Sequence, residues 1–276
     1  MNQQDYQKLW DNYFAPQIRV PMPDFLQFTE AERLLQDYLD IFRGNNSRVA
    51  GQPTLYEHPF FKPNGSPKLE SIPQIRYILI GECRMPLKAP KLNECVPFKG
   101  DTENTYFYDI RHVKPTPYFN KPLKVWEFEG KITCPREKAK ALLHLASNGV
   151  LLLDLFPFAI NYTTGIRQSL NEGGITKSFW DDPLNPYNLK SRICSIRSLL
   201  HEEWDLTMIA PVTISAHIVN PINGFAVLPI VPTGLHPSQF QSIGMAHQRH
   251  KNAANYRKVA IASSGFTTAE LIGLSF

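Results

Sequence analysis

Short runs of apolar residues alternate along this chain with longer, helix-like segments. Four runs have the length of buried strands: residues 75–81, 150–155, 206–211 and 225–231. The helix-like segments cover residues 3–14, 30–43, 135–148, 188–203 and 245–261. Most of the apolar runs are separated by helices or long connections, as parallel strands require. The pattern therefore predicts a three-layer α/β/α domain around a central, mostly parallel four-stranded sheet.

The segment at 30–43 carries helix boundary signals. Thr29 stands where an N-cap is expected, Glu32 follows at the spacing of a capping box, and Gly44 lies beyond the end. From Gly44 to Pro73 the chain is rich in Gly, Pro, Asn and Ser and has no apolar period. We therefore expect residues 1–70 to form a helical and extended segment that packs on the core, and residues 71–276 to form the α/β/α domain.

Three of the apolar runs end in polar residues. Gly81 and Glu82 follow the first run, Asp154 ends the second, and His236-Pro237-Ser238 follows the last. In an open parallel sheet the carboxyl ends of the strands share one edge, where ligands bind. We expect these three polar tips to meet in one crevice.

Composition narrows the class of protein only a little. The 276 residues include 43% apolar residues, enough for a sizeable core. The formal net charge of +4 permits a nucleic-acid or phosphate partner without requiring one. Many of the 23 prolines cluster in the connections, which favours rigid loops.

Cysteine spacing and the N-terminal residues bear on cofactors and compartment. The four cysteines are widely spaced, with no Cys-x-x-Cys pair, so we expect reduced thiols and no metal site. The N-terminus lacks a basic start followed by an apolar core, and no run reaches about 18 apolar residues. We expect a soluble, cytoplasmic protein that does not bind membranes, with a monomer as the favoured state.

Four segments, in order, carry a resemblance to a known family. They are residues 78–82 (ILIGE), 97–101 (PFKGD) followed by 106–108 (YFY), 149–154 (GVLLLD) and 236–238 (HPS). Together they resemble the motifs of the uracil-DNA glycosylase superfamily, over about residues 72–262. The resemblance implies the α/β/α fold of that superfamily, DNA as the partner, and extrusion of a base into the crevice.

The resemblance also implies roles for particular residues. Hydrolysis of an N-glycosidic bond develops negative charge on the departing base and oxocarbenium character on the sugar. His236 would donate a hydrogen bond to the base, Glu82 would lie near the sugar, and Asp154 would read the base edge. Phe98 would stack on the base.

Further positions would contact the DNA itself. Ser238 would hydrogen-bond a phosphate oxygen, and Phe240 follows where the family inserts an apolar wedge into the base stack. Basic residues, among them Lys99 and Arg249, would line a phosphate track and make binding sensitive to salt.

Two positions depart from the family pattern. Asp154 stands where uracil-removing members usually carry Asn, and an ionised carboxylate only accepts hydrogen bonds. A base edge that offers donors is then preferred over uracil, or the carboxyl is protonated. Cys83 stands where active members often carry Asp or Asn to activate water. Either Glu82, Asp101 or Asp109 takes over that role, or Cys83 is a small buried residue and hydrolysis is lost.

Three functions follow from these observations and remain open. The first is a DNA glycosylase-like N-glycosyl hydrolase for a damaged or modified base other than standard uracil. The second is a catalytically silent nucleic-acid-binding protein on the same fold, and the third is an enzyme acting on a free nucleoside or nucleotide. Members with an iron-sulfur cluster use cysteines near the N-terminus, and none precedes Cys83, so we expect no cofactor.

Overall fold

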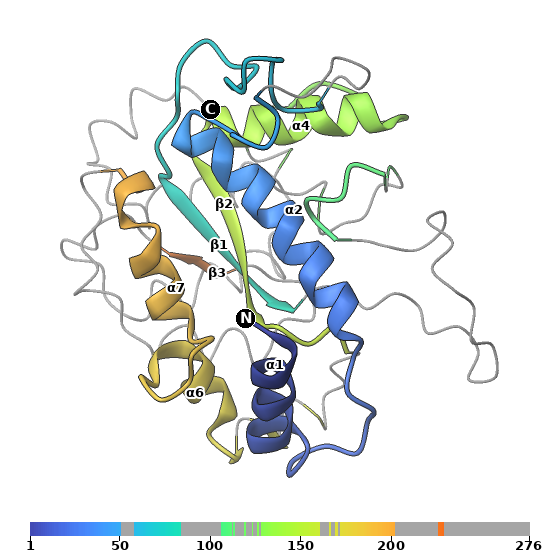
Figure 1. Cartoon of the computed structure of the whole chain (residues 1–276), viewed down its shortest axis with the longest axis vertical. Coiled ribbons are helices and arrows are strands. Elements are labelled where there is room, and N and C mark those ends of the chain that lie inside the picture. The colour runs from blue at the N-terminus through green and yellow to red at the C-terminus, as the bar shows by residue number, and fades with distance from the viewer. Residues whose placement is uncertain are drawn as a thin grey trace.

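A computed structural model of the chain gives its fold (Figure 1). It describes residues 1–50, 58–83, 106–111, 113, 119, 123, 126, 128–160, 166, 169–170, 172–201 and 226–228.

The described strands form a sheet with the order β2-β1-β3. The central strand β1 (Tyr77–Cys83) pairs in parallel with β2 (Val150–Phe156) and antiparallel with the short β3 (Ala226–Leu228). Every position of β2 is buried, as expected for a strand covered on both faces. The predicted strands at 75–81 and 150–155 are confirmed within two residues at each end.

Helices cover this sheet. Figure 1 shows α2 (Phe25–Arg43) and α7 (Leu189–Ser195) on the viewer's side, with α1 (Gln3–Leu9) and α6 (Ile175–Asp181) toward the carboxyl ends of β1 and β2. Helix α4 (Pro135–Ser147) leads into β2 at the other end. The helix predicted at 135–148 is confirmed, with Pro135 in the first turn, where its missing N–H costs nothing.

The start of α2 corrects a prediction. The helix begins at Phe25, and the Asp24 carboxylate caps it by accepting the Leu26 N–H at 2.9 Å. Thr29 lies inside the helix, where its hydroxyl donates to the Leu26 carbonyl oxygen at 2.9 Å. The predicted Thr29 cap and its capping box are therefore wrong, because a stronger capping residue stands five positions earlier. The helix end is as predicted, with Gly44 in the left-handed region at φ 75°.

Two other predicted helices are divided in the structure. The segment at 3–14 is the α-helix α1 followed directly by a π-helix, η1 (Trp10–Phe14). The segment at 188–203 contains α7, then a short 3₁₀ turn, η2 (Arg197–Leu199), and Leu200 in a parallel bridge with Ile75. Apolar spacing alone did not distinguish one long helix from these shorter pieces.

The direction of β3 also differs from expectation. A central sheet of mostly parallel strands was predicted, but the described part of the run at 225–231 pairs antiparallel with β1. A wholly apolar run reports burial and gives no strand direction, since direction depends on the connection before it. The strand predicted at 206–211 and the helix at 245–261 lie outside the described residues, so the four-stranded sheet stays a prediction.

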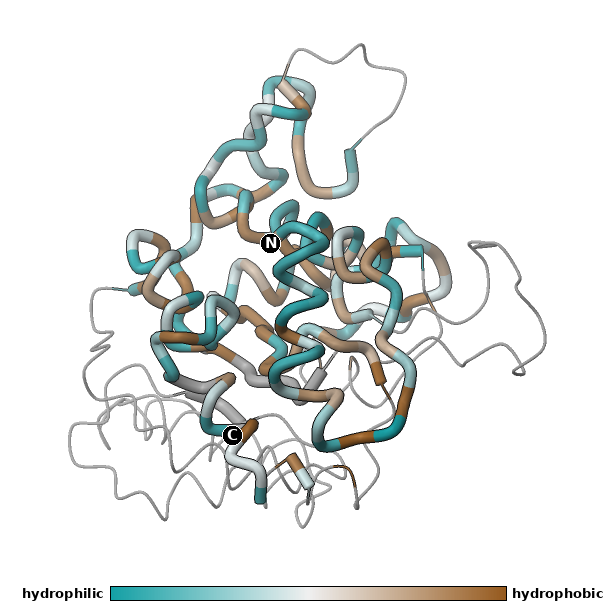
Figure 2. Tube along the Cα trace, turned by 60° about the horizontal axis from the view of Figure 1, so that its bottom comes forward, coloured by the Kyte–Doolittle hydropathy of each residue, from teal (hydrophilic) through white to brown (hydrophobic). Residues whose placement is uncertain are grey.

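The N-terminal helices share one hydrophobic core with the sheet. The Phe14 ring lies 4.7 Å from that of Phe158 and 5.4 Å from that of Phe156, and the Phe179 ring lies 5.4 Å from that of Phe156. Hydrophobic stretches along the described chain are short and interrupted (Figure 2). Among the described helices, none has the length and apolar character needed to cross a membrane.

Candidate functional site

The parallel pair brings two of the predicted site segments together. Gly81 of β1 is the Cα partner of Asp154 of β2, and Cys83 is the partner of Phe156. The carboxyl ends of the two strands therefore lie side by side. Segments 73 residues apart in the sequence thus meet at one edge of the sheet.

Asp154 is not a strand tip. It lies within β2, two positions before the end of the strand, and only 4% of its surface is exposed. Neighbouring strand positions alternate between the faces of a sheet, so position 83 shares a face with position 154 and position 82 belongs to the other.

Backbone groups of β2 also face away from β1. The Gly149 carbonyl oxygen accepts the Arg76 N–H at 2.8 Å on the β1 side. Successive peptide groups of a strand point to opposite sides. The carbonyl groups of Val150, Leu152 and Asp154 therefore point away from β1. An unpaired buried edge must find other hydrogen-bond partners.

Three side chains supply those partners. The Tyr38 hydroxyl donates to the Val150 carbonyl oxygen at 2.8 Å. The Tyr108 hydroxyl donates to the Leu152 carbonyl oxygen at 2.8 Å and accepts the Leu152 N–H at 2.7 Å. Arg192 Nη1 donates to the Asp154 carbonyl oxygen at 2.6 Å. Side chains from α2, from residues 106–111 and from α7 thus fix the backbone that carries Asp154.

The two tyrosines form a buried pair behind β2. Their ring centroids lie 4.5 Å apart. Burial is the main cause that raises the pKa of Tyr38 and the pKa of Tyr108 well above the usual value, so both hydroxyls stay protonated and can donate. Residues 106–108 follow the segment that carries Phe98, and Tyr106, Phe107 and Tyr108 are buried in the core.

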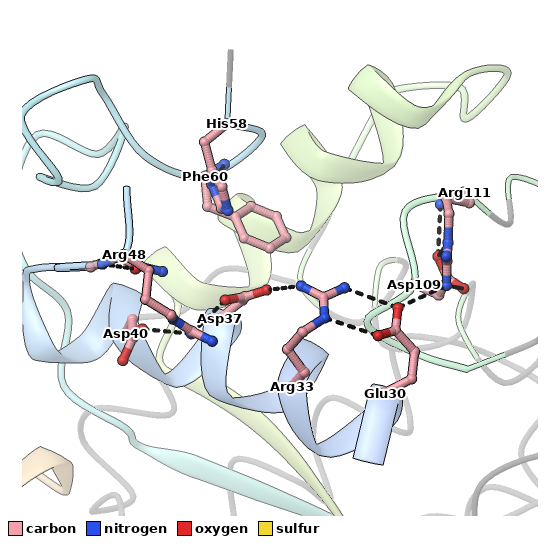
Figure 3. A network of polar contacts seen from close by, with 10 residues as sticks. Glu30, Arg33, Asp37, Asp40, Arg48, His58, Phe60, Asp109 and Arg111 are labelled. Atoms are coloured by element: carbon pink, nitrogen blue, oxygen red, sulfur yellow. Dashed lines mark hydrogen bonds and ion pairs between the residues drawn. The ribbon is translucent and has the colours of Figure 1, made fainter. Parts of the chain in front are cut away.

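A network of charged side chains holds residues 106–111 against α2 (Figure 3). Arg111 binds both carboxylate oxygens of Asp109 at 2.8 Å and reaches Glu30 of α2 at 3.3 Å. The hydrogen bond from Arg33 is the largest cause that lowers the pKa of Glu30. The network continues along α2 through ion pairs: Arg33 with Glu30 at 2.9 Å and with Asp37 at 2.8 Å, and Arg48 with Asp37 at 2.7 Å.

Asp109 was one candidate to activate water in place of Cys83. It is 1% exposed, and both of its carboxylate oxygens accept from Arg111. Its backbone oxygen accepts from Lys138 Nζ at 2.6 Å. Asp109 therefore anchors the segment that carries Tyr108, and both of its carboxylate oxygens are engaged in doing so.

Lys138 is a buried amine on α4. Its Nζ lies 4.8 Å from the centre of the Phe119 ring. Burial lowers the pKa of Lys138 to about 8, partly opposed by the charge of Asp109. No local pattern predicts this burial, because a lysine in an amphipathic helix ordinarily lies in solvent.

The strand that precedes the last predicted segment, β3, ends at the other edge of the sheet, beside the beginning of β1. Leu228 pairs with Ile78, near the beginning of β1, because β3 runs antiparallel. The carboxyl ends of β1 and β2 therefore meet, as predicted, whereas the carboxyl end of β3 does not join them. The remaining predicted residues lie outside the described part of the chain: Phe98, Lys99, Asp101, His236, Ser238, Phe240 and Arg249.

Sequence reasoning missed Tyr38 and Arg192, which hold β2 in place. Tyr38 is indistinguishable in the sequence from any core aromatic, and Arg192 from any polar residue of a short helix. Their role depends on tertiary contacts across 112 and 38 positions, respectively, and no local pattern reports it.

Among the described residues, no group of three or more His, Cys, Asp or Glu side chains could hold a metal ion. Cys134 and Cys194 are free thiols.

Compared with protein-family models, with curated proteins and with solved structures, the chain gave no match.

Proposed function

We propose that this chain is a DNA glycosylase-like N-glycosyl hydrolase that takes a damaged or modified base into the carboxyl edge of its sheet. The observation that carries the proposal is the pairing of Gly81 with Asp154, two positions before the carboxyl ends of two parallel strands. It brings together two of the segments that resemble the uracil-DNA glycosylase superfamily. Ligands bind at this edge in open α/β sheets.

Asp154 is the residue proposed to read the base. Arg192 fixes its backbone from one side and β1 from the other. A fixed carboxylate in a site that excludes water interacts more strongly than one in solvent. An ionised carboxylate complements an amino group or a ring N–H, so the proposed substrate base presents donors at that edge.

His236 is the proposed donor to the departing base. The chain leaves β3 at Leu228, whose partner Ile78 is three residues before Gly81, about 10 Å along a strand. Eight residues lead from Leu228 to His236, and an extended chain of that length spans up to about 26–29 Å. The antiparallel β3 is therefore compatible with a His236 that returns to the carboxyl edge.

Turnover on modified oligonucleotides tests the proposal. The purified protein is incubated with single- and double-stranded oligonucleotides that carry uracil, hypoxanthine, xanthine or an alkylated base, and abasic sites are measured. The proposal expects product on at least one base other than uracil, lost in His236→Ala. An Asp11→Asn variant, which changes an exposed carboxylate of η1, controls for charge and should keep full activity. The absence of product on every substrate contradicts the proposal.

The second candidate is a nucleic-acid-binding protein without hydrolysis. It is favoured by the identity of residue 83, a cysteine at the β1 position paired with Phe156, and by Asp109, whose carboxylate is engaged with Arg111. This candidate predicts oligonucleotide binding that weakens with salt, without turnover. Stabilisation by a free nucleoside, without binding or turnover of oligonucleotides, would instead support the third candidate.

A further inference from the structure

A cavity of about 420 Å³ lies between α2, α7 and β2. Its volume falls within the range of small-molecule sites. Its floor is apolar and comes from two elements, α2 and β2: Phe28, Leu35, Leu39 and Leu153.

Arg192 provides a positive charge on the wall of this cavity. Its guanidinium lies 4.1 Å from the centre of the Tyr187 ring, and Nη1 donates to the Asp154 carbonyl oxygen. Within the described part of the chain, no carboxylate forms an ion pair with Arg192. A guanidinium has five N–H donors in a planar fork that matches a carboxylate. Arg192 is thus held in position with donors left over for a ligand.

Glu32 provides negative charge on the same wall. It accepts a hydrogen bond from the Tyr187 hydroxyl at 3.1 Å, and Asp5 also lines the cavity. The Tyr187 ring therefore links the two charges: Arg192 lies over its face and Glu32 meets its hydroxyl. This arrangement presents both signs of charge above an apolar floor.

We propose that the cavity binds a free α-amino acid with an apolar side chain. The ligand carboxylate pairs with Arg192, the ammonium group pairs with Glu32, and the side chain rests on the floor. The lining carries the carboxylates of Asp5 and Glu32 and the guanidinium of Arg192, so a ligand with both an ammonium and a carboxylate group complements it. The proposal does not depend on the proposed function.

Calorimetric titration of the full chain tests the ligand class. The probes are L-leucine, L-methionine and L-phenylalanine, with N-acetyl-L-leucine and L-leucinol as analogues that each lack one charge. We expect at least one amino acid to bind one per chain. If L-leucine binds, both analogues should bind at least tenfold more weakly than it does. The proposal is overturned if none of the three amino acids binds, or if either analogue matches L-leucine.

Two variants test the assigned residues. Glu32→Gln keeps an acceptor for the Tyr187 hydroxyl and removes the charge, and Arg192→Gln removes the carboxylate partner. Each should weaken binding at least tenfold, whereas Arg197→Gln, an exposed arginine of η2, should leave affinity unchanged. If Arg192→Gln does not fold, Glu32→Gln decides, and unchanged affinity in that variant overturns the assignment.

Discussion

Single hydroxyl groups complete the buried edge of the sheet. Tyr108→Phe removes a group that both donates to and accepts from Leu152, and leaves two buried backbone groups without a partner. We expect a loss of about 2 to 4 kcal/mol in the free energy of unfolding. Urea denaturation measures it, with Tyr13→Phe on a half-buried ring as the control that should change little. Equal losses in the two variants would contradict the edge role of Tyr108.

Lys138 predicts a particular dependence of stability on pH. Its pKa falls to about 8 in the folded protein and is near 10.5 in the unfolded chain. Between these values the unfolded state binds more protons, so this group makes the protein more stable as pH rises. We expect wild type to gain stability relative to Lys138→Met between pH 8 and about 10.5. Urea denaturation at several pH values measures the difference, and a constant difference would contradict the buried amine.

At the scale of elements, the two possible starts of α2 make different predictions. Asp24→Ala removes the observed cap and should cost about 1 kcal/mol. Thr29→Ala should change stability by less than about 0.5 kcal/mol, because Thr29 lies inside the helix. Thermal or urea unfolding of both variants distinguishes the two positions. A larger loss in Thr29→Ala would favour the start predicted from the sequence.

The elements also show what the sequence can and cannot predict. The runs at 75–81 and 150–155 were found because burial on both faces requires continuous apolar residues. The antiparallel direction of β3 was not found, since no residue in the run encodes direction. The Gly81 and Asp154 pairing follows from two local patterns, whereas the support from Tyr38 and Arg192 depends on contacts made only in the folded chain.

At the scale of the whole molecule, the formal net charge of +4 would favour binding to a nucleic acid. A protein that neutralises phosphates releases the counterions condensed on the nucleic acid. This release is less favourable at higher salt concentration, so the binding weakens. We expect affinity for an oligonucleotide to fall by at least tenfold between 50 and about 200 mM salt. Fluorescence anisotropy measures this, and an affinity independent of salt would contradict a phosphate track.

The base specificity of Asp154 tests the central claim most directly. Wild type and Asp154→Asn are compared for abasic-site formation on oligonucleotides that carry uracil, hypoxanthine, xanthine or an alkylated base. An amide both donates and accepts, so the account predicts that the variant gains activity on uracil relative to the base preferred by wild type. An unchanged order of preference, with both proteins active, would contradict the placement of the base at Asp154.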